Sequence, residues 1–471
     1  MSNKVAPTAG SGGGDDAEAQ LIAAGDAPSA GEAAAPTRKQ AVADVTFLQI
    51  FTKFVLLGWT AFGGPAAHIA LFQKIFVERL EWVSDTIFTE FLALGQCLPG
   101  PTSTQMSFAL GTLWKGIPGG LMTGMLFQYP GLLMMSLVGI GAAEFLIDPE
   151  PWLKGVVDGL SAVGVALVAA AALGLIKGQC KDRTTTILCC LSGTIAYYYQ
   201  SAWIFPLILL VGGLVTLIER WKKPLDPDNE EMKELPIKMW QGSVLVVLWL
   251  AILVSSIVLR RIIDYQDAKP LHWFEGMYRT GSIIFGGGQV VLPLMIEEVN
   301  QDGCNSMECI DNDATNGTSW MTADQFYAGL GAAQAMPGPL FNLAAYIGAV
   351  VSMNAGMYRA GTVAGIATCW VGLFAPGILL IFGVLPFWGR VRNFPVYKKL
   401  LPGFNSSAVG LVVASVFQMF VKVRGVSSFP DASVCIGILG FGSVQILKAP
   451  APLAVLGGGV LGVIAWATKM T

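Results

Sequence analysis

Long runs without a charged residue constrain this chain more than any other feature. Residues 116–143, 186–218 and 360–389 are uncharged, and each run exceeds the roughly 20 residues that a helix needs to cross the hydrocarbon layer. With 54% hydrophobic and 13% charged residues, the 471-residue chain has too much apolar surface for a water-soluble core. The sequence therefore predicts an all-α polytopic membrane protein with roughly 10–14 membrane segments.

Polar segments divide the chain. Residues 1–43 are rich in Ala, Gly, Pro and Ser and lack the apolar core of a signal peptide, which predicts a disordered N-terminal tail in the cytosol. A targeting peptide for an organelle is the alternative. A second polar segment, 219–239, separates a first half (44–218) from a connecting transmembrane helix (240–262) and a second half (263–471).

Two apolar runs are interrupted by the same triplet, proline-glycine-proline. The first copy is Pro99, Gly100 and Pro101, and the second is Pro337, Gly338 and Pro339. Proline has no N–H donor and disfavours helix at the preceding residue, so each triplet should break its helix. Freed backbone inside hydrocarbon is costly unless protein or a water-lined cavity satisfies it. The breaks predict a polar site within the membrane; helices that are merely kinked and packed by Pro and Gly are the alternative.

The two halves repeat a set of short motifs in the same order. "GWTAFGGPAAHI" at 58–69 corresponds to "GSIIFGGGQVVL" at 281–292, and each stands ahead of its Pro-Gly-Pro copy. Further along, "YPGLL" and "SAVGVALVAA" correspond to "APGIL" and "SAVGLVVASV". Such duplication is typical of transporters built from two structural repeats.

Charge around the repeats indicates that the halves face opposite sides of the membrane. The segment 142–154 after the first break has three acids against one basic residue, Lys154, whereas its counterpart at 390–399 is basic. Before the breaks the bias reverses, with Lys74 and Arg79 in the first half and no Lys or Arg at 280–358. A third pair of loops is basic in both halves and disagrees. Under the positive-inside rule, two pairs of three favour an inverted repeat with broken or re-entrant helices.

Together these motifs resemble the chromate ion transporter family in its long-chain, two-domain form. The resemblance rests on "FGGPAAHIA" and "QCLPGPTSTQ" and on their degenerate second copies, "FGGGQVVLPL" and "GLGAAQAMPGPLFN". It implies a secondary transporter of chromate, or of the similar anion sulfate, that works as an antiporter driven by the proton motive force. The second copy has Gly288 and Val291 where the first has Pro65 and His68, so the halves should contribute unequally.

Helices that begin after the breaks would point N–H groups and partial positive charge at the site, which suits a dianion where Lys and Arg are scarce. Neighbouring hydroxyls and amides can add donors, although bonding between helices explains them equally well. The expected substrate-binding residues are Gly63, Gly64, Pro65, Gln96, Pro99, Gly100, Pro101, Ser103, Gln105, Gly286, Gly287, Gly288, Gln334, Pro337, Gly338, Pro339 and Asn342.

Charged and titratable residues near the motifs form a second set of candidates. Lys74 and Arg79 could attract the anion at the cytoplasmic mouth, although topology alone also accounts for them. His68, Glu90 and Asp324 are candidates for proton coupling, because ionisable groups within a membrane are often functional. Packing is the alternative for the histidine, and a place at the membrane edge is the alternative for the acids.

The segment 300–319 contains Cys304, Cys309, several acids and the glycosylation pattern at Asn316, but no basic residue. We expect it to lie outside the cell with a disulfide between the two cysteines; free thiols are the alternative. Glycosylation would depend on a eukaryotic source.

Other classes of function are less well supported. With two histidines and no metal-ligand spacing, we expect no metal and no cofactor, and a membrane-embedded enzyme is the weakest reading. A passive anion channel would use the same helix ends, so it remains an alternative function. The expected partners are the oxyanion and the lipid of the cell membrane, not nucleic acid, and a homodimer stays open.

Overall fold

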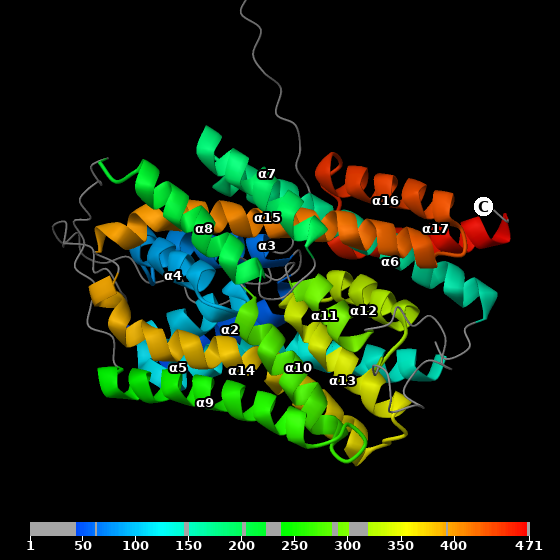
Figure 1. The fold of residues 1–471 in the computed structure, drawn as a ribbon, viewed down its shortest axis with the longest axis horizontal. Coiled ribbons are helices and arrows are strands. Elements are labelled where there is room, and N and C mark those ends of the chain that lie inside the picture. Colours follow the sequence, from blue (N-terminus) through cyan, green and yellow to red (C-terminus); the bar gives the residue numbers. More distant parts are fainter. Residues whose placement is uncertain are drawn as a thin grey trace, which may run out of the picture. The chain divides into compact units, whose positions relative to one another are not determined.

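The computed structural model describes residues 44–61, 64–145, 150–199, 204–222, 237–284, 291–300, 319–391 and 394–468. These residues form sixteen α-helices and two short helices of other types (Figure 1). Their bounds are α2 Phe47–Thr60, α3 Gly64–Phe72, η1 Gln73–Arg79, α4 Asp85–Cys97, α5 Thr102–Phe145, α6 Pro151–Gln179, α7 Arg183–Tyr198, α8 Ile204–Glu219, α9 Met239–Ile262, α10 Lys269–Ile283, α11 Val291–Val299, α12 Ala323–Ala335, η3 Leu340–Asn342, α13 Leu343–Asn354, α14 Ala360–Val391, α15 Pro395–Val426, α16 Pro430–Gln445 and α17 Ala451–Ala467.

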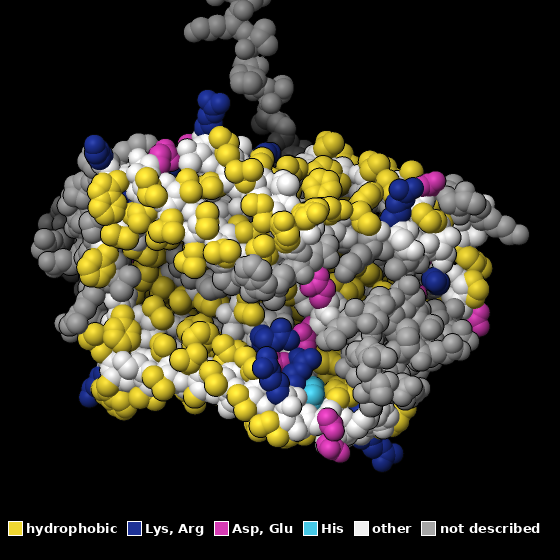
Figure 2. Space-filling view, in the orientation of Figure 1, with side chains coloured by type: hydrophobic (Ala, Val, Ile, Leu, Met, Phe, Trp, Pro, Cys, Tyr) yellow, Lys and Arg dark blue, Asp and Glu magenta, His cyan; other side chains and the backbone are white. Residues whose placement is uncertain are grey.

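Five described helices are long and apolar enough to cross a membrane, namely α5, α6, α9, α14 and α15. Four shorter apolar helices of 10–17 residues, in α2, α8, η3–α13 and α17, fall below a full crossing of roughly 20 residues. Large apolar side chains of α9 are exposed, Val247 by 66%, and hydrophobic side chains cover much of the face shown in Figure 2. Exposed apolar surface of this extent indicates contact with lipid. The prediction of an all-α polytopic membrane protein is confirmed.

Both predicted helix breaks are present. Residues 98–101 separate α4 from α5, and residues 336–339 separate α12 from η3 and α13. The central glycines have positive φ, +120° at Gly100 and +91° at Gly338. Only glycine adopts this region without steric cost, which explains why glycine stands between the two prolines.

Each break is followed by a helical hairpin, which is the kinked helix α5 after the first break and the pair α13–α14 after the second. α5 kinks at Lys115 and Gly116, and α13 is joined to α14 by a turn with Gly356 at φ +75°. The arms of the α5 hairpin approach through glycine, since a Cβ on Gly111 would lie 2.3 Å from the carbonyl O of Gly119. The arm before the α5 kink is about 20 Å long, too short for a hydrocarbon layer of about 30 Å.

The last helices of each half pack against the other half. The pair α16–α17 of the second half packs on α6, and the pair α7–α8 of the first half packs on α15 (Figure 1). Small residues let the backbones approach. A Cβ on Gly159 would lie 2.1 Å from the carbonyl O of Gly458, and one on Gly212 would lie 2.8 Å from that of Gly403. The two halves are therefore interlocked.

The helices α6 and α15, which carry the repeated "SAVG" motif, run antiparallel. Asn405 in the first third of α15 donates from Nδ2 to Oε1 of Gln179 at the end of α6, at 3.3 Å. Ser428, just beyond α15, donates its N–H to Oδ2 of Asp158 near the start of α6, at 2.8 Å. Equivalent helices of the repeat thus begin at opposite ends of their packed pair.

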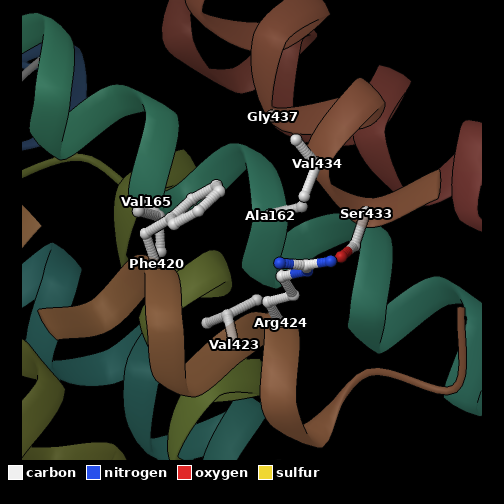
Figure 3. Close-up of a pocket in the computed structure, with 8 residues that line it drawn as sticks. All are labelled: Ala162, Val165, Phe420, Val423, Arg424, Ser433, Val434 and Gly437. Carbon is white, nitrogen blue, oxygen red and sulfur yellow. The ribbon is translucent and has the colours of Figure 1, made fainter. Parts of the chain in front are cut away.

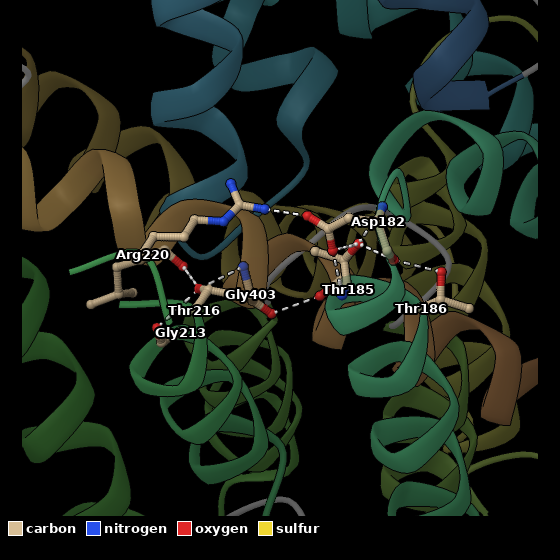
Figure 4. A network of polar contacts seen from close by, with 9 residues as sticks. Asp182, Thr185, Thr186, Gly213, Thr216, Arg220 and Gly403 are labelled. Atoms are coloured by element: carbon tan, nitrogen blue, oxygen red, sulfur yellow. Dashed lines mark hydrogen bonds and ion pairs between the residues drawn. The ribbon is translucent and has the colours of Figure 1, made fainter. Parts of the chain in front are cut away.

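A polar clasp joins α7, α8 and α15 at one end (Figure 4). Asp182 accepts the N–H of Thr185 at 2.8 Å and pairs with Arg220 beyond α8. The hydrogen bond from the Thr185 N–H lowers the pKa of the Asp182 carboxyl. The contact therefore stabilises the fold at pH values above the ordinary pKa of a carboxyl, and this stabilisation is lost as the pH falls through the lowered pKa. Gly403 donates its N–H to Oγ1 of Thr216 at 3.1 Å, which holds α8 to α15.

Candidate functional site

Each Pro-Gly-Pro break is bonded to the residue just before the glycine-rich motif of the other half. Gly100 donates its N–H to the carbonyl O of Ile284 at 2.8 Å, and Gly338 donates to that of Ala61 at 2.8 Å. Ile284 directly precedes "FGGG", and Ala61 directly precedes "FGG". These reciprocal bonds bring together the repeated motifs that predicted the site. Each half therefore contributes residues to the site of the other.

His68 connects the two breaks. Its ring is fully buried, with Nε2 3.0 Å from the carbonyl O of Ala61 and Nδ1 3.3 Å from Oγ of Ser103. Because a carbonyl only accepts, Nε2 carries a proton, and in the neutral ring Nδ1 accepts from the Ser103 hydroxyl. Ala61 also accepts from Gly338, so one carbonyl and one imidazole join the second break to the start of α5. Val291, at the position of His68 in the second half, has no side-chain polar atom with which to repeat this link.

The breaks also pack against the long helices through glycine. A Cβ on Gly100 would lie 2.9 Å from Cα of Gly377 on α14, and a Cβ on Gly131 of α5 would lie 2.7 Å from the carbonyl O of Pro337. Gly377 and Gly131 are the glycines of "APGIL" and "YPGLL". A third repeated motif therefore belongs to the site. The repetition of this motif in both halves was visible in the sequence and could have indicated its place in the site, but no role was predicted for it.

Two predicted donors are already used by the protein. Gln105 donates from Nε2 to the carbonyl O of Pro99 at 2.7 Å. Asn342 donates from Nδ2 to the carbonyl O of Gln128 at 3.3 Å and accepts from Nε1 of Trp370 at 2.9 Å. Both amides bond a break to neighbouring backbone. This is the structural role that the sequence analysis gave as the alternative to substrate binding.

The predicted charged residues have surroundings of their own. Lys74 and Arg79 are exposed on η1, and Glu90 is half-buried on α4. Asp324, in the first turn of α12, pairs with Lys154 of α6 at 3.6 Å. Among the candidates for proton coupling, His68 is bonded to Ala61 and to Ser103, which adjoin the second and the first break.

Several predicted residues lie outside the described part of the chain. These are Gly63, Gly286, Gly287 and Gly288 of the glycine-rich motifs, the cysteines Cys304 and Cys309, and the side chain of Gln96. Gly64 begins α3, and Pro65 follows it, half-buried.

A charge quartet was not foreseen from the sequence. Arg260 of α9 pairs with Glu275 of α10 and, at 2.7 Å, with Glu298 of α11. Arg279 of α10 pairs with the same two carboxylates at 2.7 and 2.5 Å. The side chains of Glu275 and Glu298 are only 2% and 8% exposed, so the quartet cancels buried charge. Glu275 and Arg279 have the i, i+4 spacing of a helix pair, which was the available signal.

A small surface hollow lies between α6, α15 and α16 (Figure 3). Its lining residues are Ala162, Val165, Phe420, Val423, Arg424, Ser433, Val434 and Gly437. Arg424 pairs with the exposed Asp431 at 3.1 Å. None of the residues predicted to bind substrate lines this hollow, so it is separate from the site at the breaks.

Comparison with known proteins finds the same family over both halves. The family model described as chromate transporter matches residues 48–217 and 271–463. A probable chromate transport protein of Synechococcus elongatus is 25% identical over 89% of this chain and 95% of its own length. Chromate transport proteins of Pseudomonas aeruginosa and Cupriavidus metallidurans are 27% and 24% identical over 80% and 89% of this chain, and over 81% and 94% of their own lengths.

No solved structure matches the chain. The two regions matched by the family model are the two halves that carry the repeated motifs, and they include both Pro-Gly-Pro breaks. Because this match covers most of the residues, the chain belongs to the chromate transporter family.

Proposed function

We propose that this protein is a secondary transporter that carries chromate across the cell membrane, with sulfate as a second substrate and the proton motive force as its energy source. Relatives named chromate transport proteins align with most of the chain. The observation that carries the proposal is the reciprocal bonding of each break to the other half, because it ties each interrupted helix to the glycine-rich motif of the opposite repeat.

A dianion can be bound here without a fixed positive charge. The first N–H groups of a helix lack an intrahelical acceptor and carry partial positive charge, and α5 begins directly after the first break. Gly100 and Gly338 donate to carbonyls, so the N–H groups proposed for the anion are those of residues 102–104 and 340–341. Gln334 adds a donor, since its Nε2 is buried without a partner in the described part of the chain.

His68 supplies a route for proton coupling. Protonation of the ring would turn Nδ1 from an acceptor into a donor, which reverses its bond with Ser103 beside the first break. A proton taken up at His68 would therefore act directly on the proposed anion site.

Flux measurements distinguish a coupled carrier from a passive channel. We expect chromate uptake into proteoliposomes to saturate with concentration, to compete with sulfate and to change with an imposed proton gradient. Molybdate tests the tolerance for a larger tetrahedral anion, and protein-free liposomes are the control. Flux that neither saturates nor follows the gradient would identify a passive channel instead.

Antiparallel packing of α6 and α15 supports an inverted repeat. The positive-inside rule, applied to Lys74 and Arg79 of the first half, is the argument for an N-terminus in the cytosol. Glu150 and Phe394 each directly precede the proline that starts one of these helices. We expect single cysteines at Glu150 and Phe394, in a background without native cysteines, to react with an impermeant maleimide from opposite sides. Reaction of both from one side of intact cells would contradict the inversion.

A further inference from the structure

Two polar side chains of α5 are buried without a hydrogen-bond partner among the described residues. Gln128 is 0% exposed with both Nε2 and Oε1 unbonded, and Thr104 is 1% exposed with Oγ1 unbonded. Other hydroxyls of α5 behave differently, because those of Ser107, Thr123 and Ser136 each donate to a backbone carbonyl at 2.7 Å. An unbonded buried amide costs free energy, so a partner from outside the chain is the simplest reason to retain one.

The α5 hairpin places these two side chains on facing arms. Thr123 of the second arm donates to the carbonyl O of Ser107 on the first arm, which fixes the antiparallel register. Thr104 lies about one helical turn before Ser107 on the first arm, and Gln128 lies in the next helical turn after Thr123 on the second arm. In the antiparallel register the two turns are therefore opposite each other.

Both residues adjoin a Pro-Gly-Pro break. Thr104 is the third residue after Pro101, at the start of α5. Gln128 accepts through its backbone carbonyl from Nδ2 of Asn342, which is the third residue after Pro339. The pair is therefore connected to the first break along its own helix and to the second break through Asn342.

We propose that Gln128 and Thr104 are ligands of the transported anion, donating amide N–H and hydroxyl O–H groups to a fully deprotonated tetrahedral oxyanion. This inference rests on the transport function proposed above and names side chains that recognise its substrate. The hydrogens of an amide and a hydroxyl match oxygens that carry no proton of their own. Gln105 and Asn342 are engaged with the protein, so Gln128 and Thr104 join Gln334 as the side-chain donors proposed for the anion.

Replacing Gln128 by leucine tests the inference. Leucine fills similar space and removes an amide that has no partner among the described residues, so thermal stability should stay the same or rise. The Kd for chromate and for sulfate, measured by calorimetry on the purified full chain, should rise about 5- to 150-fold. Thr104→Val should weaken binding by about 5- to 10-fold.

Ser136→Ala is the matched control, because the Ser136 hydroxyl donates to the carbonyl O of Leu132 within the same helix. Its Kd should equal that of the parent. If the parent binds chromate and the folded Gln128→Leu and Thr104→Val variants bind equally well, the inference is overturned while the proposed function stands. If Gln128→Leu fails to fold and Thr104→Val binds like the parent, the amide is structural and the inference is also overturned. A parent that binds neither anion would overturn the proposed function itself.

Discussion

The Gly100→Ala substitution should lower the rate of chromate transport roughly 100-fold, and Gly338→Ala should lower it roughly 10-fold. Both glycines have positive φ, where an L side chain costs about 1–3 kcal/mol. Only Gly100 meets an additional obstacle. A Cβ there would lie 2.9 Å from Cα of Gly377, whereas the nearest atom to a Cβ on Gly338 is a side-chain nitrogen at 3.4 Å. Backbone cannot give way as a side chain can, so Gly100→Ala must also move the first break off α14.

The measurement is the initial rate of chromate uptake by proteoliposomes with equal amounts of reconstituted protein. Gly141→Ala is the control, because Gly141 lies in helical α5 and an added Cβ would have no atom within 4 Å apart from its chain neighbours and the adjacent backbone of its own helix. That variant should transport normally and be stabilised by up to about 1 kcal/mol. Normal uptake by Gly100→Ala would show that transport does not depend on the geometry of the first break.

Glu275→Gln should destabilise the protein by about 3 kcal/mol. The change leaves Arg260 and Arg279 with one carboxylate, Glu298, in place of two. Removing one member of a buried ion pair costs about 3–5 kcal/mol, and the lower end applies because the two arginines are a quarter to a third exposed. Thermal unfolding of the detergent-solubilised protein, followed by intrinsic fluorescence, should show a clearly lower midpoint.

Two comparisons isolate the charge effect. Arg424→Gln removes one member of the exposed Arg424–Asp431 pair and should cost under about 1 kcal/mol. The double variant Glu275→Gln/Arg279→Gln restores charge balance, so its loss should be smaller than the sum of the two single losses. Equal midpoints for Glu275→Gln and Arg424→Gln would mean that the quartet contributes no more than a surface pair.

Much of the architecture could be predicted because it depends on local chemistry. Uncharged apolar runs require lipid, and proline removes a donor wherever it stands, so the class of protein and both breaks followed directly from the sequence. The presence of two equivalent breaks followed from repetition, since motifs that recur in the same order occupy equivalent places. The departure at Val291 likewise indicated an asymmetric site, and His68 does make a link that Val291 cannot make.

Contacts between distant segments could not be predicted in this way. Gln128 stands one residue before "YPGLL" in an apolar run, and nothing local shows that its amide lacks a partner in the part of the chain that the structure describes. The role of Arg260 depends on two other helices, and the placement of Gln105 against Pro99 depends on how the break folds. The packing of α7–α8 on α15 rather than on α6 leaves no trace in hydrophobic periodicity, because glycine faces suit either neighbour.

The exchange of helices between the halves also bears on biosynthesis. During translation α7 and α8 are complete long before α15 has been made. Until then, the glycine faces that α15 covers, at Gly193 and Gly212, must contact lipid or another helix. The first half alone therefore cannot reach its final packing. We expect membrane insertion to proceed helix by helix but the fold to close only when α15, α16 and α17 have been made, so the two halves together are the smallest stable unit.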